Sequence, residues 1–187
     1  FYPEGGGQLG DQGSLGDVMV CDTMIENGTI YHLTDGPLPI GDVSCTVNWD
    51  RRRQLMDHHT AVHIVGGSAR TILGPHIWQA GSNKGARYAR IDLTHFSRLS
   101  RDEINRIEDL SNDVITADYE VEKLVMPRAE ADELFGFELY QGGPPKSGHI
   151  RVIRIGDHDV QACGGTHHDK VGKIGELRII RSSQVQD

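Results

Sequence analysis

The chain has 187 residues, which is room for one domain of ordinary size or two small ones in contact, without disulfide bonds to support the core. Hydrophobic residues make up 37% and charged residues 25%, and no apolar run approaches the roughly 20 residues needed to cross a bilayer. The composition therefore excludes a mini-protein and predicts a soluble globular protein with no membrane partner.

The formal net charge of −8 argues against a polyanionic partner such as nucleic acid. The distribution of charge weakens that argument, because eight acids and only two arginines lie between Arg101 and Glu122. That segment carries −6, and the other 165 residues together carry only −2. A basic surface elsewhere on the molecule remains compatible with the composition.

The three cysteines, Cys21, Cys45 and Cys163, are an odd number at wide spacings, and no signal peptide precedes them. A disulfide framework is not expected, and the reducing cytoplasm is the predicted setting. The chain begins at Phe1 without an initiator Met and ends in a polar run. We interpret it as an excised piece of a longer protein.

Short β-like runs separated by turn signals fill the first 50 residues. The runs cover residues 18–21, 29–33 and 43–47, with turn signals at 27–28, 35–37 and 41–42. This pattern predicts a small β-barrel or meander over residues 1–50. Near residue 50 the apolar period becomes helical, which marks the expected subdomain boundary.

Residues 51–187 are expected to form an α+β core. A long helix runs to about Leu73, where Gly74 and Pro75 stop it, and a capping box of Ser100 and Glu103 opens a second helix whose acids face water. Strand-like runs cover residues 88–93, 121–126, 150–155, 159–162 and 176–180, with a short helix around 128–135. The predicted fold class is α+β: a barrel-like unit, then an α/β sandwich of two long helices on a mainly antiparallel sheet.

His59 and His63 are spaced i to i+4 in the first predicted helix and so lie on one face, as two ligands of one metal ion would. Such a pair arises easily by chance among ten histidines, and alone it is equally consistent with a surface or core pair. Cys163 and His167 form a second pair at the same spacing. Three imidazoles and one thiolate are a common zinc ligand set, and together they predict a zinc site.

The role of this zinc is open, because four protein ligands are typical of a structural site whereas a catalytic site keeps a position for water or substrate. His58 and His168 adjoin the candidates and offer substitutes. A neighbouring side chain on a helix points about 100° away, which favours His59 and His167.

Two other features have both a functional and an ordinary interpretation. The glycine-rich run 4–8 can present backbone N–H groups to a carbonyl, carboxylate or phosphate oxygen, or can simply be a flexible turn. The basic clusters 51–53 and 84–90 can contact phosphates, although solvated surface is the commoner meaning. Thr60 follows His59 where zinc peptidases carry a glutamate base, and no Walker A pattern is present. Cys163 remains possible as a nucleophile.

Taken in order, the motifs resemble the editing domain of alanyl-tRNA synthetase, closer to the archaeal type. They are FYPEGGGQ at residues 1–8, GDQG at 10–13, HTAVH at 59–63, QAGS at 79–82, RIDLTH at 90–95 and CGGTH at 163–167. Free-standing AlaX-type editing proteins share these motifs, but the start of the chain and its ending at 179–187 are more similar to an interior segment of the synthetase.

The resemblance implies hydrolysis of the ester that joins serine or glycine to the alanine tRNA, with zinc as the metal. The implied partners are the acceptor end of tRNA(Ala) and the rest of the synthetase chain. The residues implied or chosen on this basis are His59, His63, Cys163 and His167 for zinc; Gln79, Cys163 and Thr60 for catalysis; Gly5, Gly6, Gly7, Gln8, Val62, Arg90 and Asp92 for substrate; and Arg51, Arg52, Arg53, Lys84 and Arg87 for tRNA. Relatives also carry Thr at the position of Val62.

Reading the extra hydroxyl of serine requires a hydrogen-bonding group, for which Thr60, Gln79 or the metal shell are the candidates, whereas glycine requires a steric limit. The alternative function is a non-catalytic, zinc-stabilised nucleic-acid-binding module whose four ligands close around a structural ion. A zinc hydrolase of unrelated small substrates is disfavoured, because no glutamate adjoins either histidine of the first pair.

Overall fold

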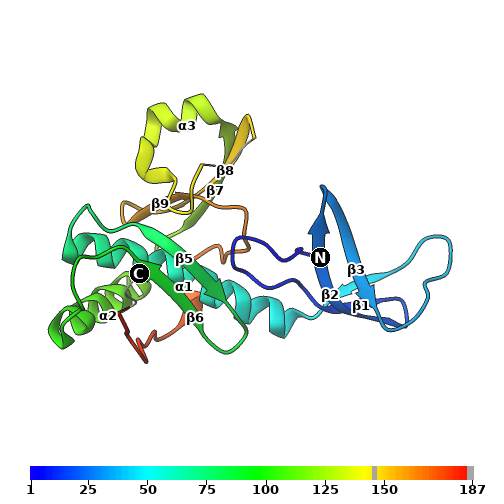
Figure 1. The fold of residues 1–187 in the computed structure, drawn as a ribbon. Helices are drawn as coiled ribbons and strands as arrows, with labels where there is room; N and C mark the ends of the chain where they lie inside the picture. The colour runs from blue at the N-terminus through cyan, green and yellow to red at the C-terminus, as the bar shows by residue number, and fades with distance from the viewer. Residues whose placement is uncertain (145–146, 185–187) are drawn as a thin grey trace.

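The structure is a computed structural model that describes residues 1–144 and 147–184. Its ribbon consists of an N-terminal sheet, a long central helix and an α+β body packed around that helix (Figure 1). All the strand pairings between named strands are antiparallel in the described part of the chain. The α+β class predicted from the sequence is confirmed.

The N-terminal unit is an open antiparallel sheet, so of the two predicted alternatives, a small barrel or a meander, the barrel does not form. The sheet contains β1 (Gly13–Leu15), β2 (Val18–Glu26), β3 (Thr29–Thr34) and β4 (Cys45–Val47), in the order β3-β2-β1-β4. Four strands, two of them only three residues long, are too few to surround a core and close on themselves. The side chains of Leu15, Val20 and Thr23 are the ones that this sheet buries.

Helix α1 (Trp49–Leu73) joins the sheet to the body and carries the first metal-ligand pair. It begins where the side chain of Asn48 accepts a hydrogen bond from the amide of Arg51, and it ends at Gly74, whose φ of 115° only glycine adopts readily. The sequence placed both ends correctly. Figure 1 shows α1 running through the middle of the molecule, so its central turns are covered by the other elements.

The body around α1 contains two separate sheets. One is the hairpin of β5 (Gln79–Lys84) and β6 (Ala89–Leu93), and the other has the order β7-β8-β9. The second sheet comprises β7 (Val121–Pro127), β8 (His149–Ile155) and β9 (Asp159–Ala162). The remaining helices are α2 (Arg101–Thr116), α3 (Arg128–Phe135) and the short 3-10 turns η1 (Phe137–Leu139) and η2 (Val171–Ile174).

Helix α2 confirms the explanation of the acidic run. Its capping box between Ser100 and Glu103 is formed in both directions, and Ile107, Val114 and Ile115 are buried. The main hydrophobic core joins α1, α2 and the β7-β8-β9 sheet through Ile64, Val114, Ile115, Val121, Ile153 and Ile155. The acids are therefore the solvated side of an amphipathic helix.

The strand expected at residues 176–180 is wrong, because this extended segment pairs with side chains instead of a neighbouring strand. The amide of Leu177 donates to Oδ1 of Asn112, and the Asn112 side-chain amide donates to the Leu177 carbonyl. Glu108 accepts from the amide of Ile179. Both acceptors lie on α2, so the end of the described chain is fixed along that helix.

The N-terminal segment also docks on the body. The amide of Lys84 donates to the Gly7 carbonyl at 2.6 Å, and residues 8 and 84 form a parallel bridge. A Cβ on Gly7 would fall 2.2 Å from the Ser82 carbonyl oxygen, so only glycine allows this approach. The glycine-rich loop is therefore attached to the edge of β5.

Candidate metal centre

Helix α1 and the loop after β9 bring the two predicted ligand pairs together. The candidate ligand atoms of His59, His63, Cys163 and His167 all lie within 4.8 Å of one another. Sγ of Cys163 is 3.3 Å from Nε2 of His59 and 3.4 Å from Nε2 of His167. The three imidazoles are buried, so the cluster is a compact set of one sulfur and three nitrogens.

Each histidine is held through its Nδ1 atom, which leaves its Nε2 for the centre. Nδ1 of His59 is 2.7 Å from Oε1 of Gln8, Nδ1 of His63 is 2.9 Å from Oδ2 of Asp159, and Nδ1 of His167 is 3.2 Å from Oγ1 of Thr60. All three partners can accept an Nδ1–H. This fixes the tautomer that presents a Nε2 lone pair, as outer residues of metal sites do.

Asp159 is itself held from two further directions. Arg70 forms an ion pair with its Oδ1, and Nε2 of Gln161 lies 3.0 Å from each carboxylate oxygen. A buried carboxylate with these partners has little freedom to rotate. It orients the ring of His63 and increases its basicity as a ligand.

The electrostatics of the four groups favour ligation. Burial raises the pKa of the Cys163 thiol, but the charge of His59 and hydrogen bonds from the three imidazoles outweigh burial and hold the pKa well below its usual value. Burial lowers the pKa of His59 to about 4. Burial also lowers the pKa of His63, but Asp159 and Cys163 outweigh it and raise the pKa to about 9. A thiolate beside imidazoles is the form of cysteine that binds metal.

The segment after β9 that carries Cys163 and His167 is a loop, so the i to i+4 spacing of this pair does not come from a helix. Nη1 of Arg151 donates to the carbonyls of Cys163 and Gly165 at 2.9 and 2.7 Å, which holds the loop in place. A Cβ on Gly165 would fall 2.0 Å from Cε1 of His59. The loop can therefore bring its two ligands to α1 only because this position is glycine.

The neighbouring histidines have other partners, which supports the choice of His59 and His167 as ligands. Nδ1 of His58 lies 2.6 Å from the Gly85 carbonyl, and Nε2 of His168 lies 2.6 Å from Oδ1 of Asp57. Neither is among the residues that form the cluster. The donor set of one thiolate and three imidazoles, whose rings are already oriented, fits zinc.

The glycine-rich loop lies beside the centre because Gln8 belongs to both. The amide of Gly5 donates to the Gln8 carbonyl and that of Gln8 to the Gly5 carbonyl, each at 3.0 Å. The buried Gln8 side chain contacts His59, and it also accepts from the Thr166 amide and donates to the Thr166 hydroxyl. Gln8, assigned to the substrate from the sequence, thus orients a ligand and the ligand loop.

Other residues assigned to substrate or catalysis have diverse positions. Thr60 is fully buried and its hydroxyl faces His167, and Val62 is buried on the same helix. Arg90 and Asp92 lie on β6 and pair with each other at 3.1 Å. The side chain of Gln79, at the start of β5, is half-buried and makes no hydrogen bond to any described residue.

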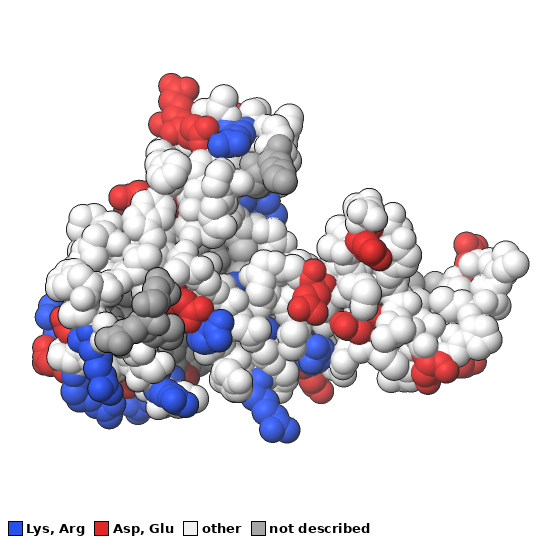
Figure 2. All heavy atoms as spheres, in the orientation of Figure 1, with Lys and Arg blue, Asp and Glu red and all other residues white. Residues whose placement is uncertain are grey.

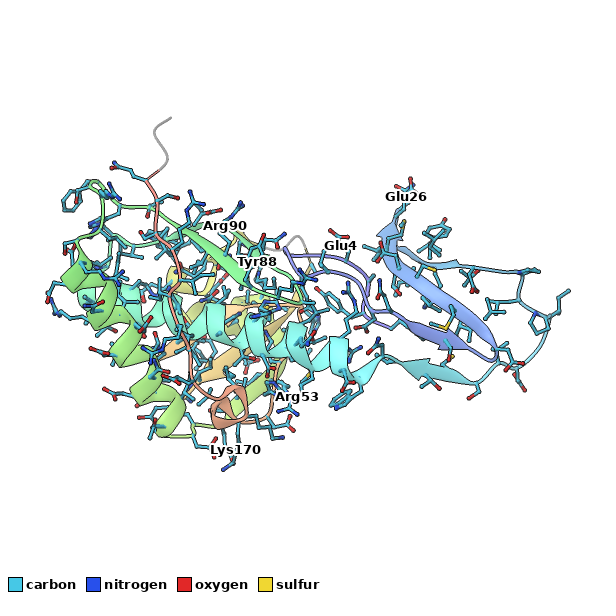
Figure 3. The ribbon with its side chains drawn as sticks, turned by 90° about the horizontal axis from the view of Figure 1, so that it is seen from below. Glu4, Glu26, Arg53, Tyr88, Arg90 and Lys170 are labelled. Carbon is cyan, nitrogen blue, oxygen red and sulfur yellow. The ribbon has the colours of Figure 1, made fainter. Side chains whose placement is uncertain are left out.

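The five basic residues assigned to tRNA do not form one surface. Arg51 donates to the Gly10 carbonyl, and Arg52 is paired with the buried carboxylate of Asp11. Lys84 is 2% exposed, and its ammonium donates to the Gly6 carbonyl at 2.7 Å and to the Ser82 hydroxyl at 2.5 Å. Arg53 and Arg87 are exposed. In Figure 3, Arg53 lies on the opposite side of α1 from Tyr88 and Arg90.

The sequence missed Asp159, Arg70 and Arg151 as supports of the centre. Their contacts join segments that are far apart in the chain, and no spacing rule reveals them. A weak signal existed for Asp159, which is a carboxylate in a predicted buried strand four residues before Cys163. A buried acid in such a place needs a partner, and here the partners are a ligand and an arginine.

Comparison with known proteins points to the aminoacyl-tRNA synthetases. Residues 150–187, which include Cys163 and His167, match the family described as "Threonyl and Alanyl tRNA synthetase second additional domain".

In the described residues, no helix combines the length and the apolar character that crossing a membrane requires.

The most informative relatives are archaeal. The chain is 43% identical over its whole length to the alanine–tRNA ligase of Methanopyrus kandleri, 44% to that of Halorubrum lacusprofundi and 45% to that of Natronomonas pharaonis. It spans 20 to 21% of the length of these proteins. The chain is thus homologous to a segment of archaeal alanine–tRNA ligases, and the resemblance to an alanyl-tRNA synthetase editing domain drawn from its motifs is confirmed.

Proposed function

We propose that the chain is an editing hydrolase that cleaves the ester between serine or glycine and tRNA(Ala). The observation that carries this proposal is the junction at Gln8, which places a buried zinc-type ligand set beside a glycine-rich loop. The similarity to alanine–tRNA ligases supplies the substrate class. We further propose the cytoplasm as its setting and the rest of a synthetase chain as its partner.

Zinc held by His59, His63, Cys163 and His167 would supply a fixed positive charge that orients the aminoacyl group or polarises its carbonyl. Four protein donors leave little room for another ligand in a tetrahedral site. This supports a positioning role for the metal, with the remaining work done by groups of the chain itself.

The glycine-rich loop is the candidate for contacts to the reacting carbonyl. Gly6 and Gly7 have φ angles of 56° and 77°, and their amides make no hydrogen bond within the described residues. Gly6 is exposed and a Cβ there would meet nothing within 4 Å, so the space above the loop is open. Two adjacent N–H groups of this kind can stabilise negative charge that develops on a carbonyl oxygen.

Selection of serine falls to Gln79 and not to Thr60. The Thr60 hydroxyl is buried and faces His167, so it acts as a positioning residue for that ligand. The side chain of Gln79 has no protein partner in the described residues, which leaves its amide to bind the serine hydroxyl. A site that hydrogen-bonds a hydroxyl discriminates strongly against an analogue that lacks it.

The acceptor end of the tRNA would approach over the β5-β6 hairpin. Arg87 and Tyr88 are exposed there, and Figure 3 shows Tyr88 and Arg90 next to each other on this hairpin. An arginine and an exposed ring are suited to a phosphate and an unstacked base. Arg51 and Arg53 lie in the first turns of α1 and are secondary candidates for contacts to the tRNA.

The test is deacylation of Ser-tRNA(Ala) and Gly-tRNA(Ala), compared with Ala-tRNA(Ala), by the zinc-loaded chain. We expect rapid loss of serine and glycine only, and loss of activity in Cys163→Ala. Gln79→Ala should lose activity towards serine by about 10²-fold or more with its zinc content unchanged. Gln54→Ala, which changes an exposed glutamine of α1, is the matched control and should behave as wild type.

The alternative binding module predicts a different set of results. The chain would bind tRNA without cleaving any ester, Gln79→Ala would have no effect, and chelation of zinc would unfold the protein. The set of four protein ligands, with its three imidazoles buried, is the observation that favours this alternative. Absence of hydrolysis with retained tRNA binding would replace the editing proposal with this one.

A further inference from the structure

A basic surface that none of the motifs includes lies at the far end of α1. Arg98, in the loop before α2, and Arg181, in the segment after η2, are 83 positions apart in the sequence. They line one shallow hollow of about 520 Å³, together with Ser182, Ser183 and Gln184. Figure 2 shows Lys and Arg side chains gathered over this end of the molecule, near α2.

Within the residues that the structure describes, neither arginine has a counter-charge. Each side chain is exposed, and neither forms an ion pair or a hydrogen bond with a described residue. The described lining of the hollow consists of two guanidinium groups, two hydroxyls and an amide, with no carboxylate among these residues. Two acids of α2 have other partners: Glu103 accepts from Ser100, and Glu108 pairs with Arg178. On a chain of charge −8, two unpaired cations in one hollow are a specific feature.

The surface is held by the core and is not a chance meeting of two loops. Leu99, next to Arg98, and Ile179, two residues before Arg181, both pack on the hydrophobic cluster of Ala69, Ile77 and Ile107. Leu73, the last residue of α1, packs on the same cluster. The two arginines are therefore placed by buried neighbours before any ligand binds, which reduces the entropy lost on binding.

An exposed ring lies two positions before Arg98 in the same loop. Phe96 is 82% exposed, and its ring lies 4.4 Å from that of His95, which stacks on His76 at 5.1 Å. Guanidinium groups for phosphates next to accessible rings for bases or riboses are the usual composition of an RNA-binding surface.

We propose that the Arg98–Arg181 hollow binds the phosphodiester backbone of tRNA, at a site separate from the one where the acceptor end is hydrolysed. This inference rests on the proposed function for the identity of the RNA. Leu73 follows His63 by ten residues, which is about 15 Å along the helix. A tRNA whose terminal nucleotide reaches the metal centre has its acceptor stem close enough to contact this hollow.

The experiment measures the affinity of the 187-residue chain for uncharged tRNA(Ala) over a range of salt concentrations. The variant is Arg98→Gln with Arg181→Gln, and the matched control is Lys123→Gln with Lys173→Gln, which removes the same charge from residues that pair with Asp169. We expect the double arginine variant to bind about tenfold more weakly at low salt. The slope of log affinity against log salt should become shallower by about 1.5 to 2, and the control should match wild type.

Equal affinity and slope in the arginine variant and wild type would overturn the proposal, and would leave a protein partner for this surface. The charge-reversal variant Arg98→Glu with Arg181→Glu is a second test, and we expect it to lose more affinity for tRNA than the glutamine variant. All four side chains are exposed, so an unchanged melting temperature verifies folding. Because uncharged tRNA is the probe, the outcome is independent of deacylation: hydrolysis of Ser-tRNA(Ala) with unaltered binding would reject the surface and keep the editing function.

Discussion

Gly165 lies against the ring of His59, at a distance where a single added methyl group would fall 2.0 Å from Cε1 and 2.3 Å from Nδ1. His59 cannot move aside easily, because its ring is buried and its Nδ1 is held by Gln8. Gly165 therefore sets how closely the ligand loop approaches α1.

The first prediction follows from this contact. Gly165→Ala should push the loop away from α1 and lower the affinity for zinc by about 10- to 100-fold, as disruption of outer supports does in other metal sites. Competition with a chromogenic chelator measures this affinity. Gly164→Ala is the matched control, since a Cβ at that exposed position meets nothing within 4 Å. Equal affinities in the two variants would contradict the role of Gly165.

The second prediction concerns Asp159, which orients His63. Asp159→Asn keeps the shape of the side chain but removes the charge that Arg70 and His63 share. Zinc affinity should fall by about 10- to 100-fold, and the melting temperature of the zinc-loaded protein should fall with it. Asp157→Asn changes an exposed acid that pairs with Arg154, three positions earlier, and should leave both quantities unchanged. Retention of full zinc affinity in Asp159→Asn would show that His63 needs no carboxylate.

The third prediction separates Lys84 from the surface cations. The buried ammonium of Lys84 fastens the Gly6 carbonyl to Ser82, and burial lowers its pKa. Lys84→Met should increase hydrogen exchange at the amides of residues 5–8 without changing the salt dependence of tRNA binding. Arg87→Gln, which removes an exposed charge, should reduce the salt slope by about 1. A similar loss of slope in both variants would return Lys84 to the tRNA-binding surface.

The fourth prediction is a dependence of stability on pH. Burial raises the pKa of Asp11, but hydrogen bonds from Arg52 and the Tyr2 amide outweigh it and hold the pKa below its ordinary value of 3.8. A carboxyl whose pKa is lower in the folded state stabilises the fold above the unfolded pKa, and this contribution is lost as the pH falls through the folded value.

Asp11→Asn should therefore be less stable than wild type by about 2 to 3 kcal/mol at pH 7. The difference should shrink as the pH falls below about 4. Urea unfolding followed by circular dichroism at several pH values measures it. Asp17→Asn, which changes an exposed acid in the same unit, should show no such dependence. A difference between Asp11→Asn and wild type that stays constant down to pH 3 would show that the charge of Asp11 has no such role.

The sequence predicted the parts of the site that depend on local spacing. His59 and His63 share a helix face, the end of α1 follows from Gly74, and the start of α2 follows from the capping box at Ser100. It could not predict the hydrogen bonds of Gln8 and Asp159, because these depend on which distant segments the fold brings together.

The cationic residues show a second limit. From sequence alone, a lysine or arginine is expected to be a surface charge, yet Lys84 is buried beneath the glycine-rich loop. Conversely, Arg98 and Arg181 stand in no basic cluster of the sequence, and only the packing of Leu99 and Ile179 makes them neighbours. The prediction of a strand at residues 176–180 was wrong for the same reason, because side chains of α2 accept hydrogen bonds from the backbone amides of that segment.

The ligand pairs are separated by a hundred positions, and Cys163 and His167 belong to the last 25 residues of the chain. During synthesis, α1 leaves the ribosome long before the second pair, so His59 and His63 can offer only half of a binding site to a metal ion. Tight metal binding then begins only when the segment with Cys163 and His167 has been made and has folded back onto the helix. A centre with all four ligands in place therefore forms only after residues 59–167 have been translated and have folded.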